Sequence, residues 1–159
     1  MRTFLAPLLA IFIFTRCDKE ELPAAKSGKL NQEVEIALNE TLELTTTSDN
    51  NTDTDKVRVH LAEINESRCP KNVNCIRYGN AIIRLWLEKD QERSDTAALV
   101  IGEALPTDTR KLRLRSADTT LVTVANTQYQ VILTSVLPYP CTSCPAQGEQ
   151  HANIIVTAK

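Results

Sequence analysis

Five cysteines carry the most distinctive chemistry in this chain of 159 residues. Cys69 and Cys75 are separated by five residues, Cys141 and Cys144 form a Cys-x-x-Cys motif, and Cys17 stands alone near the N-terminus. The four thiols after Cys17 can pair as disulfides in three ways, or they can converge as thiolates on one zinc ion. Disulfides are favoured, because the export signal described below leads to an oxidising compartment. We therefore expect four oxidised cysteines, no bound metal and no cofactor.

The Cys-x-x-Cys motif has a second interpretation, as a thiol-redox or zinc-binding site. A redox motif of the thioredoxin kind lies at a helix start, where the helix dipole lowers a thiol pKa. Here Cys141 follows Pro138-Tyr139-Pro140 and Cys144 precedes Pro145, with a strand pattern before the motif and no helical pattern after it. A c-type haem attachment would need His at the position of Pro145. Thiol-redox or zinc chemistry at Cys141 and Cys144 is therefore the alternative function.

No other side chains form a pattern that indicates catalysis. His60 and His151 are the only histidines, and neither is accompanied by a Gly-x-Ser-x-Gly elbow or another identifiable nucleophile. The chain has 18 Lys and Arg against 20 Asp and Glu, for a net charge of -2, with the two signs interspersed. Such a chain has no basic stripe that would bind a phosphate backbone. We expect no catalytic residue, no enzyme activity and no nucleic-acid partner.

Residues 1–16 predict a secretory signal peptide, and Cys17 a lipid anchor. The apolar run from Phe4 to Phe14 rises about 1.5 Å per residue and so spans only about half of a hydrocarbon core of about 30 Å. Residues 1–17 resemble bacterial lipoprotein signals, in which the cysteine is acylated and becomes the mature N-terminus. The resemblance implies palmitate on Cys17 and attachment to a membrane through the N-terminal lipid, for which more than one acyl chain is needed.

The segment after Cys17 bears on location. Asp18-Lys19-Glu20-Glu21 resembles the signal that sends some lipoproteins of Gram-negative bacteria to the outer face of the outer membrane. The alternative is a solvated charge cluster at the start of a linker. We predict a protein of the Gram-negative outer membrane, and both the periplasmic and the cell-surface face stay open. Residues 17–31 are charged and small without an apolar period, which predicts a flexible tether.

Residues 32–159 show the pattern of one all-β domain. Short runs rich in Val, Ile, Leu and Thr alternate with polar residues, turn residues separate them, and none has a helical period over ten or more residues. The pattern predicts an antiparallel β-sandwich or small barrel of about eight or nine strands. The clearest hairpin joins 121–124 to 129–137 through 125–127. The other expected strands cover 34–38, 42–44, 57–61, 81–88, 97–101, 111–115 and 154–157.

The segment Ile64-Asn65-Glu66-Ser67-Arg68-Cys69-Pro70-Lys71-Asn72-Val73-Asn74-Cys75-Ile76-Arg77-Tyr78-Gly79-Asn80-Ala81 is the most specific in the chain. It resembles the motif acidic-Ser-Arg-Cys-Pro-x-x-Val-x-Cys-x-x-x-Gly-Asn-Ala of an uncharacterised family of secreted bacterial proteins and lipoproteins. The wider likeness runs from about Val34 to Thr157. Glu66 stands where Asp is usual, and Arg77-Tyr78 replaces an aromatic-small pair. The resemblance implies a β-rich extracytoplasmic domain with a Cys69–Cys75 disulfide, and it implies no activity.

These expectations together describe a lipid-anchored binding or structural module. With Cys69 paired to Cys75, the remaining pair Cys141 and Cys144 would close a second small loop. Loops held on a rigid sandwich are where such folds place recognition, so the candidate binding loop is the Cys69–Cys75 loop with Arg68, Arg77 and Tyr78. The expected partner is an unknown protein or glycan.

Overall fold

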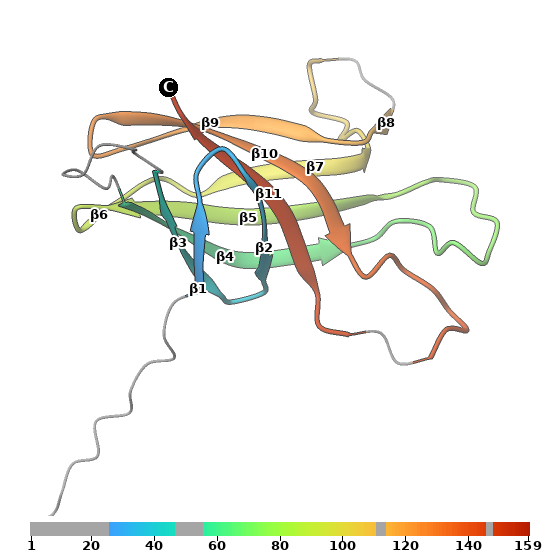
Figure 1. Cartoon of the computed structure of the whole chain (residues 1–159). Coiled ribbons are helices and arrows are strands. Elements are labelled where there is room, and N and C mark those ends of the chain that lie inside the picture. Colours follow the sequence, from blue (N-terminus) through green and yellow to red (C-terminus); the bar gives the residue numbers. More distant parts are fainter. Residues whose placement is uncertain (1–25, 47–55, 111–113, 146–147) are drawn as a thin grey trace, which may run out of the picture.

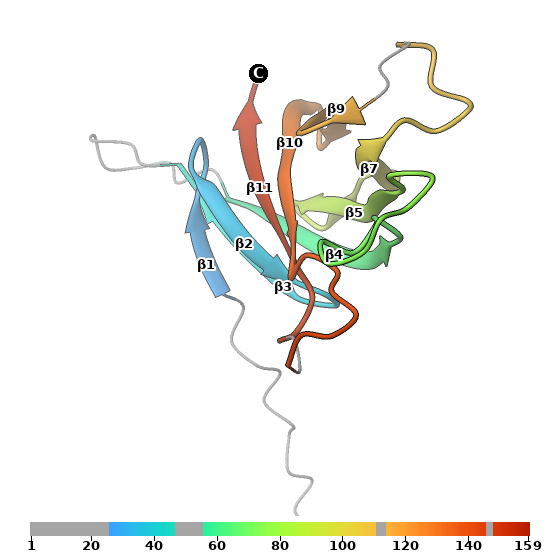
Figure 2. The same cartoon turned by 90° about the vertical axis from the view of Figure 1, so that its right-hand side faces the viewer.

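The chain folds as a β-sandwich, which confirms the predicted all-β class. The computed structural model describes residues 26–46, 56–110, 114–145 and 148–159, and within these ranges two sheets pack face to face with no helix and no closed barrel (Figure 1, Figure 2). One sheet has the strand order β1-β3-β4-β5-β7-β8 with β6 beside β5, and the other has the order β2-β11-β10-β9. The strands are β1 (Lys26–Lys29), β2 (Glu33–Ala37), β3 (Thr41–Thr45), β4 (Lys56–Glu66), β5 (Asn80–Lys89), β6 (Glu92–Arg93), β7 (Ala97–Glu103), β8 (Leu114–Arg115), β9 (Asp118–Val124), β10 (Thr127–Leu137) and β11 (His151–Ala158).

The core fills the space between the sheets. Most strands that line it, such as β3, β5 and β11, bury alternate side chains, as the period of two in the sequence predicts, whereas β7 buries Leu99, Val100 and Ile101 in succession. Tyr129 is the largest fully buried side chain. The other fully buried side chains of large volume are Ile36, Leu42, Leu44, Leu61, Ile83, Leu85, Leu87, Leu99, Leu133, Ile154 and Val57.

The strands β2 and β3 are adjacent in sequence but lie in different sheets. β2 pairs with β11, whereas β3 pairs with β4, so the chain crosses between the sheets at Leu38-Asn39-Glu40. Asn39 has φ 62°, and the Glu40 carboxylate accepts a hydrogen bond from the Ala37 backbone N–H at 2.7 Å. The alternation of apolar and polar residues therefore predicted both strands correctly. It could not show that β2 and β3 do not pair with each other.

The side chains of β4 switch faces at the point where the alternation of apolar residues in the sequence is interrupted. The register of β4 against β5 shifts between Leu61 and Glu63, so one extra residue, Ala62, is accommodated as a bulge. A bulge moves the following side chains to the opposite face. This explains why Ile64 is out of step with Val57, Val59 and Leu61, and why β4 continues to Glu66 instead of ending at 61.

The domain begins earlier than the sequence indicates. The tether was expected to reach residue 31, but β1 pairs in parallel with β3 from Lys26, and Leu30 is buried. The run contains a single large apolar residue, so it carries no apolar period. Gly28 fits because a Cβ there would lie 2.9 Å from side-chain atoms of both Leu44 and Val34.

The predicted anchor lies outside the described residues. This applies to the signal peptide (1–16), to Cys17 and to the tether as far as residue 25. In the part of the chain that the structure describes, no helix is long and apolar enough to cross a membrane.

Candidate functional site: two disulfide loops at one end of the sandwich

The Cys69–Cys75 loop joins β4 to β5 at one end of the sandwich, where the segment between β10 and β11 also lies (Figure 1). Its base is closed by three short hydrogen bonds. The Ser67 backbone N–H and hydroxyl each donate to the Asn80 carbonyl at 2.8 Å, and the Cys69 N–H donates to the Tyr78 carbonyl at 2.7 Å. The Cys69–Cys75 disulfide then links the loop across a Cα–Cα distance of 5.9 Å. The loop therefore has a fixed shape and does not depend on a ligand for its order.

Gly79 is required at the return of this loop. Its φ is +66°, a value that L side chains rarely adopt, and an added Cβ would lie 2.0 Å from the Ser67 carbonyl oxygen. The N–H and C=O of Gly79 are both bonded, because the N–H donates to the Glu103 carboxylate at 3.2 Å and the C=O accepts from the Glu103 N–H at 2.7 Å. The Gly of the motif thus has a steric explanation.

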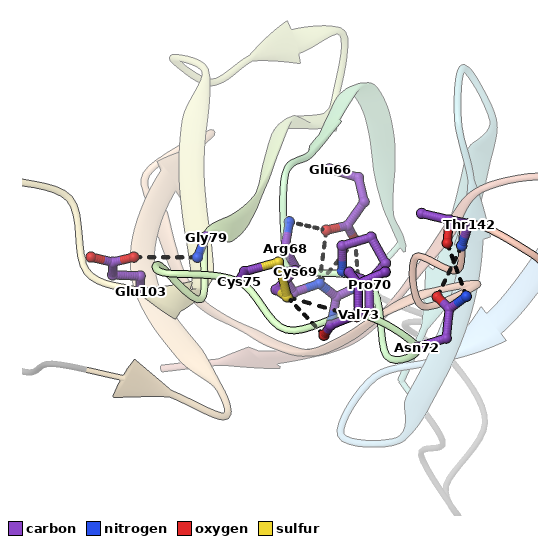
Figure 3. Close-up of a disulfide and its surroundings, with 10 residues drawn as sticks. All are labelled: Glu66, Arg68, Cys69, Pro70, Asn72, Val73, Cys75, Gly79, Glu103 and Thr142. Carbon is purple, nitrogen blue, oxygen red and sulfur yellow. Dashed lines mark hydrogen bonds and ion pairs between the residues drawn. A yellow bond between two sulfur atoms is a disulfide. The ribbon is translucent and has the colours of Figure 1, made fainter.

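A buried ion pair fixes the start of the loop (Figure 3). The side chains of Glu66 and Arg68 are 7% and 8% exposed, and Arg68 Nε lies 2.9 Å from both Glu66 carboxylate oxygens, while Nη2 makes a further short contact with Oε2. Arg68 also donates to the Val136 carbonyl at 2.6 Å and lies 4.3 Å from the ring centroid of Tyr139. One guanidinium therefore connects β4, the end of β10 and the segment that follows β10.

The two disulfide loops contact each other directly. Asn72 donates from Nδ2 to the Thr142 and Ser143 hydroxyls at 2.9 and 2.7 Å, and its Oδ1 accepts from the Thr142 N–H at 3.0 Å (Figure 3). The Lys71 N–H donates to the Pro140 carbonyl at 3.0 Å. The second disulfide, Cys141–Cys144, has a Cα–Cα distance of 5.6 Å, and the Leu137-Pro138 peptide bond before it is cis. These hydrogen bonds hold the Cys141–Cys144 loop against the Cys69–Cys75 loop.

The outer part of the first loop exposes large apolar side chains. Val73 is 43% exposed, Tyr78 is 68% exposed, and Ile76 is fully exposed. We call these three residues the apolar tip. Arg77 lies between Ile76 and Tyr78 of the apolar tip. Its guanidinium donates a hydrogen bond to the Glu103 carboxylate, with Nε 3.0 Å from Oε1. That hydrogen bond is the main cause that lowers the pKa of Glu103 and raises the pKa of Arg77.

The three residues predicted for the binding loop therefore have different surroundings. Tyr78 and Arg77 lie on the exposed side, although Arg77 is neutralised by Glu103. Arg68 is buried, holds the loop in place and is a positioning residue. Val73 and Ile76 were not singled out from the sequence, where apolar residues ordinarily indicate a core. The available signal was one apolar residue, Val73, between the two cysteines and another, Ile76, directly after them, in a segment that is otherwise polar.

A cleft of about 460 Å³ lies beside the contact between the two loops. Its walls include Glu66, Arg68, Pro140 and Thr142. Because Glu66 and Arg68 neutralise each other, the cleft has no net charge to attract a small ion. The cleft lies next to the hydrogen bonds that join the two loops, so its shape depends on both loops.

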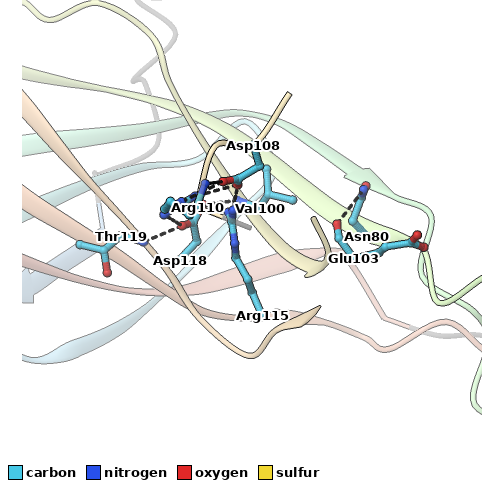
Figure 4. A network of polar contacts seen from close by, with 8 residues as sticks. All are labelled: Asn80, Val100, Glu103, Asp108, Arg110, Arg115, Asp118 and Thr119. Carbon is cyan, nitrogen blue, oxygen red and sulfur yellow. Dashed lines mark hydrogen bonds and ion pairs between the residues drawn. The ribbon is translucent and has the colours of Figure 1, made fainter. Parts of the chain in front are cut away.

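A second ionic cluster holds the segment between β7 and β9 (Figure 4). The buried carboxylate of Asp118 accepts from the Val100 N–H at 2.8 Å and from Arg110 Nη1 at 2.7 Å, and it lies 3.4 Å from Arg115 Nη1. Asp108 contacts both arginines. This cluster was not predicted, because its charged residues have no regular spacing and meet only through the fold. The cluster is neutral and fixes β8 and the start of β9.

The cysteines are arranged for structure. Each described cysteine pairs within its own loop, so thiolates that could hold zinc are not assembled, and among the described residues no group of three or more His, Cys, Asp or Glu side chains could hold a metal ion. Cys141 follows β10 and Pro138, and within the described ranges no helix begins at this motif.

Comparison of the chain with models of protein families, with curated proteins and with solved structures gave no match.

Proposed function

We propose that the chain is an exported, lipid-anchored β-sandwich module that binds a partner protein through the apolar tip, Val73, Ile76 and Tyr78. The observation that carries the proposal is the exposure of three large apolar side chains within six residues of a loop that is otherwise tightly fixed. Single exposed apolar residues are ordinary on protein surfaces, but a group of them on an ordered projection is typical of an interaction site.

The rigidity of the loop supports this function energetically. Ordering a mobile loop on binding costs free energy, so a loop already fixed by a disulfide, a buried ion pair and the Asn72 contacts retains more of the binding energy. None of the residues that make these contacts, Glu66, Arg68, Cys69, Asn72 and Cys75, belongs to the hydrophobic core between the sheets. We interpret them as preorganisation of the apolar tip.

The composition of the tip favours a protein partner over a glycan. Aliphatic and aromatic side chains with a flanking arginine are typical of the centre of protein–protein interfaces. A glycan would need several converging hydrogen-bond donors and acceptors, whereas Arg77, the charged group of the tip, is already bonded to Glu103. The partner should therefore present an apolar pocket with a largely neutral rim.

The N-terminal part of the proposal rests on the sequence. Acylated Cys17 would hold the domain at a membrane through residues that precede β1, and the outer membrane of a Gram-negative bacterium is the proposed location. Metabolic labelling with an alkyne palmitate analogue tests the anchor. We expect labelling of the natural chain and loss of label with Cys17→Ser, whereas equal labelling of both would exclude acylation at Cys17.

The binding surface is tested by site-specific photo-crosslinking in bacteria that export the chain. A photoreactive amino acid is placed at Ile76 or Tyr78, and the matched control is placed at Asn126, which is exposed in the β9–β10 turn at the opposite end of the sandwich (Figure 1). We expect one discrete adduct that both tip positions give and that Asn126 does not give. The same adduct from all three positions, or no adduct at the tip, would contradict the proposal.

The thiol alternative gives a different result in an alkylation experiment. Under the proposed function, the four loop cysteines of the denatured chain react with an alkylating reagent only after reduction. If Cys141 and Cys144 were alkylated without reductant and zinc co-purified, the second loop would be a metal or redox site instead. Mass spectrometry of the intact chain, with and without a chelator, distinguishes these outcomes.

A further inference from the structure

We infer that the outer edge of β9 pairs with β9 of a second copy of this chain, in an antiparallel and symmetric strand pair. β9 is the last strand of its sheet and pairs with β10 on one side only. The inference concerns a surface separate from the apolar tip and does not depend on the proposed function.

The turn between β9 and β10 determines which backbone groups face outwards. Ala125 and Asn126 have φ of 46° and 57°, as in a two-residue type I′ turn, and Val124 pairs with Thr127 across it. Residues that flank such a turn form a hydrogen-bonded pair, and the pairs alternate along the ladder. Val122 and Thr120 therefore also bond to β10, whereas the N–H and C=O of Thr119, Leu121 and Thr123 face away from it.

The hydrogen bonds agree with this assignment. The Thr119 N–H is bonded at 3.0 Å to Asp118 Oδ1 and not to β10. Among the described residues, none hydrogen-bonds the outward N–H or C=O of Leu121 or Thr123. Two residues of β9 therefore present backbone donors and acceptors that have no partner from the described part of the chain.

The three other strands that end a sheet carry features that oppose pairing, and β9 does not. β1 has four residues and contains Lys26 and Lys29, β2 contains Glu33 and Glu35, and β8 has only two residues. Charged, especially lysine-rich, and very short edge strands are the usual protection against association. From Thr119 to Val124, β9 has no charge, no proline and no register shift.

The side chains of β9 are self-complementary about Leu121. The exposed row is Thr119, Leu121 and Thr123, and Leu121 is 56% exposed. An antiparallel pair centred on Leu121 places the two Leu121 side chains opposite each other and each Thr119 opposite Thr123 of the other copy. Threonine pairs and aliphatic pairs stabilise facing strands, and like charges do not occur anywhere in the pairing. This symmetry favours a second copy over an unrelated extended segment.

The backbone of such a pair can form four hydrogen bonds without changing β9. Each Leu121 N–H donates to the Leu121 carbonyl of the other copy, and each Thr123 N–H donates to the opposite Thr119 carbonyl. The Thr119 N–H stays on Asp118, so the buried ionic cluster at the start of β9 is kept. The contact area is small, and we therefore expect a weak dimer that depends on concentration.

The test is sedimentation velocity of the full chain in a non-ionic detergent, from about 10 to about 300 µM, the range in which a small interface associates. We expect the natural chain to dimerise as the concentration rises. Leu121→Lys and Leu121→Glu should each be monomeric, because identical charges would face each other, and their equimolar mixture should dimerise again.

The matched control Ile76→Lys changes another exposed aliphatic residue to lysine and should dimerise like the natural chain. Thermal melts of all variants verify that they are folded.

The inference would be overturned by a natural chain that stays monomeric throughout, by a dimer that persists in both charged variants, or by a mixture of the charged variants that does not associate. A natural chain that is monomeric alone but is bound at this edge by an extended peptide would equally exclude self-pairing. Loss of dimer in Ile76→Lys alone would assign the contact to the apolar tip instead.

Discussion

Removing Arg68 should destabilise the domain strongly, even though Arg68 lies in a loop. The substitution Arg68→Met keeps much of the side-chain volume but leaves the Glu66 carboxylate buried without its partner. It also removes the donor to the Val136 carbonyl and the guanidinium next to Tyr139. Because the Glu66 and Arg68 side chains are only 7% and 8% exposed, water cannot easily replace the lost contacts.

The magnitude follows from that burial. Breaking a buried ion pair by removing one partner costs about 3 to 5 kcal/mol of unfolding free energy, because the remaining charge is uncompensated. In the double variant Glu66→Gln/Arg68→Met no charge is left, and the Gln oxygen can still accept the N–H of residue 68. Its loss should be about 1 to 3 kcal/mol, the cost of the unsatisfied Val136 carbonyl. The double variant should therefore be more stable than the single one.

The assay is urea unfolding of the non-reduced protein, followed by the fluorescence of Trp86, the only tryptophan. With a slope of about 2 kcal/mol per M, the midpoint of Arg68→Met should fall by about 1.5 to 2.5 M. Arg77→Met is the matched control, since its guanidinium is 73% exposed and solvent screens its ion pair. If Arg68→Met lost no more stability than Arg77→Met, or if the double variant were the least stable, the assigned role of the ion pair would be refuted.

Three further predictions concern the same end of the sandwich. Gly79→Ala should lower the melting temperature by more than Gly148→Ala, because a Cβ at 79 meets a carbonyl oxygen at 2.0 Å and one at 148 meets nothing within 4 Å; equal melting temperatures would contradict the steric argument. Cys69→Ser should cost about 2 kcal/mol, the loop-closure estimate for so short a loop, and an unchanged melting temperature of the non-reduced protein would mean that the disulfide has no structural role. Because the hydrogen bond from Arg77 lowers the pKa of Glu103 in the folded state, its contribution is present above the pKa of the unfolded chain and is lost as the pH falls through the lower folded value. Urea midpoints measured at decreasing pH should therefore fall less steeply for Arg77→Met than for the natural chain, and parallel profiles would exclude this linkage.

Local patterns predicted most of the strands, because a sandwich buries every second side chain. The sequence located the β9–β10 hairpin, both Cys pairs and the exposed position of Tyr78. It placed Arg68 on the candidate binding loop, because loops held on a rigid sandwich are where such folds place recognition, but in the structure this side chain is buried. The buried partner, Glu66, was visible two residues away, but the carbonyl of Val136 that completes the site is 68 residues distant in sequence. Contacts between segments that are distant in sequence leave no periodic pattern and no regular spacing of residues. For this reason the sequence did not predict β1, the separation of β2 from β3 or the ionic cluster at Asp118.

The two ends of the sandwich differ in a way that the hydrophobic core does not require. At one end, β9 and β10 are joined by two residues whose backbone alone makes the turn. At the other end, the loops carry two disulfides, a buried ion pair and a set of hydrogen bonds through Asn72. The ion pair reaches from the first loop to the ends of β4 and β10, and the loop that it holds exposes the side chains of Val73 and Ile76. A fold that needed only to be stable would bury such residues or replace them, and for this reason we propose that the exposed surface of these loops binds a partner.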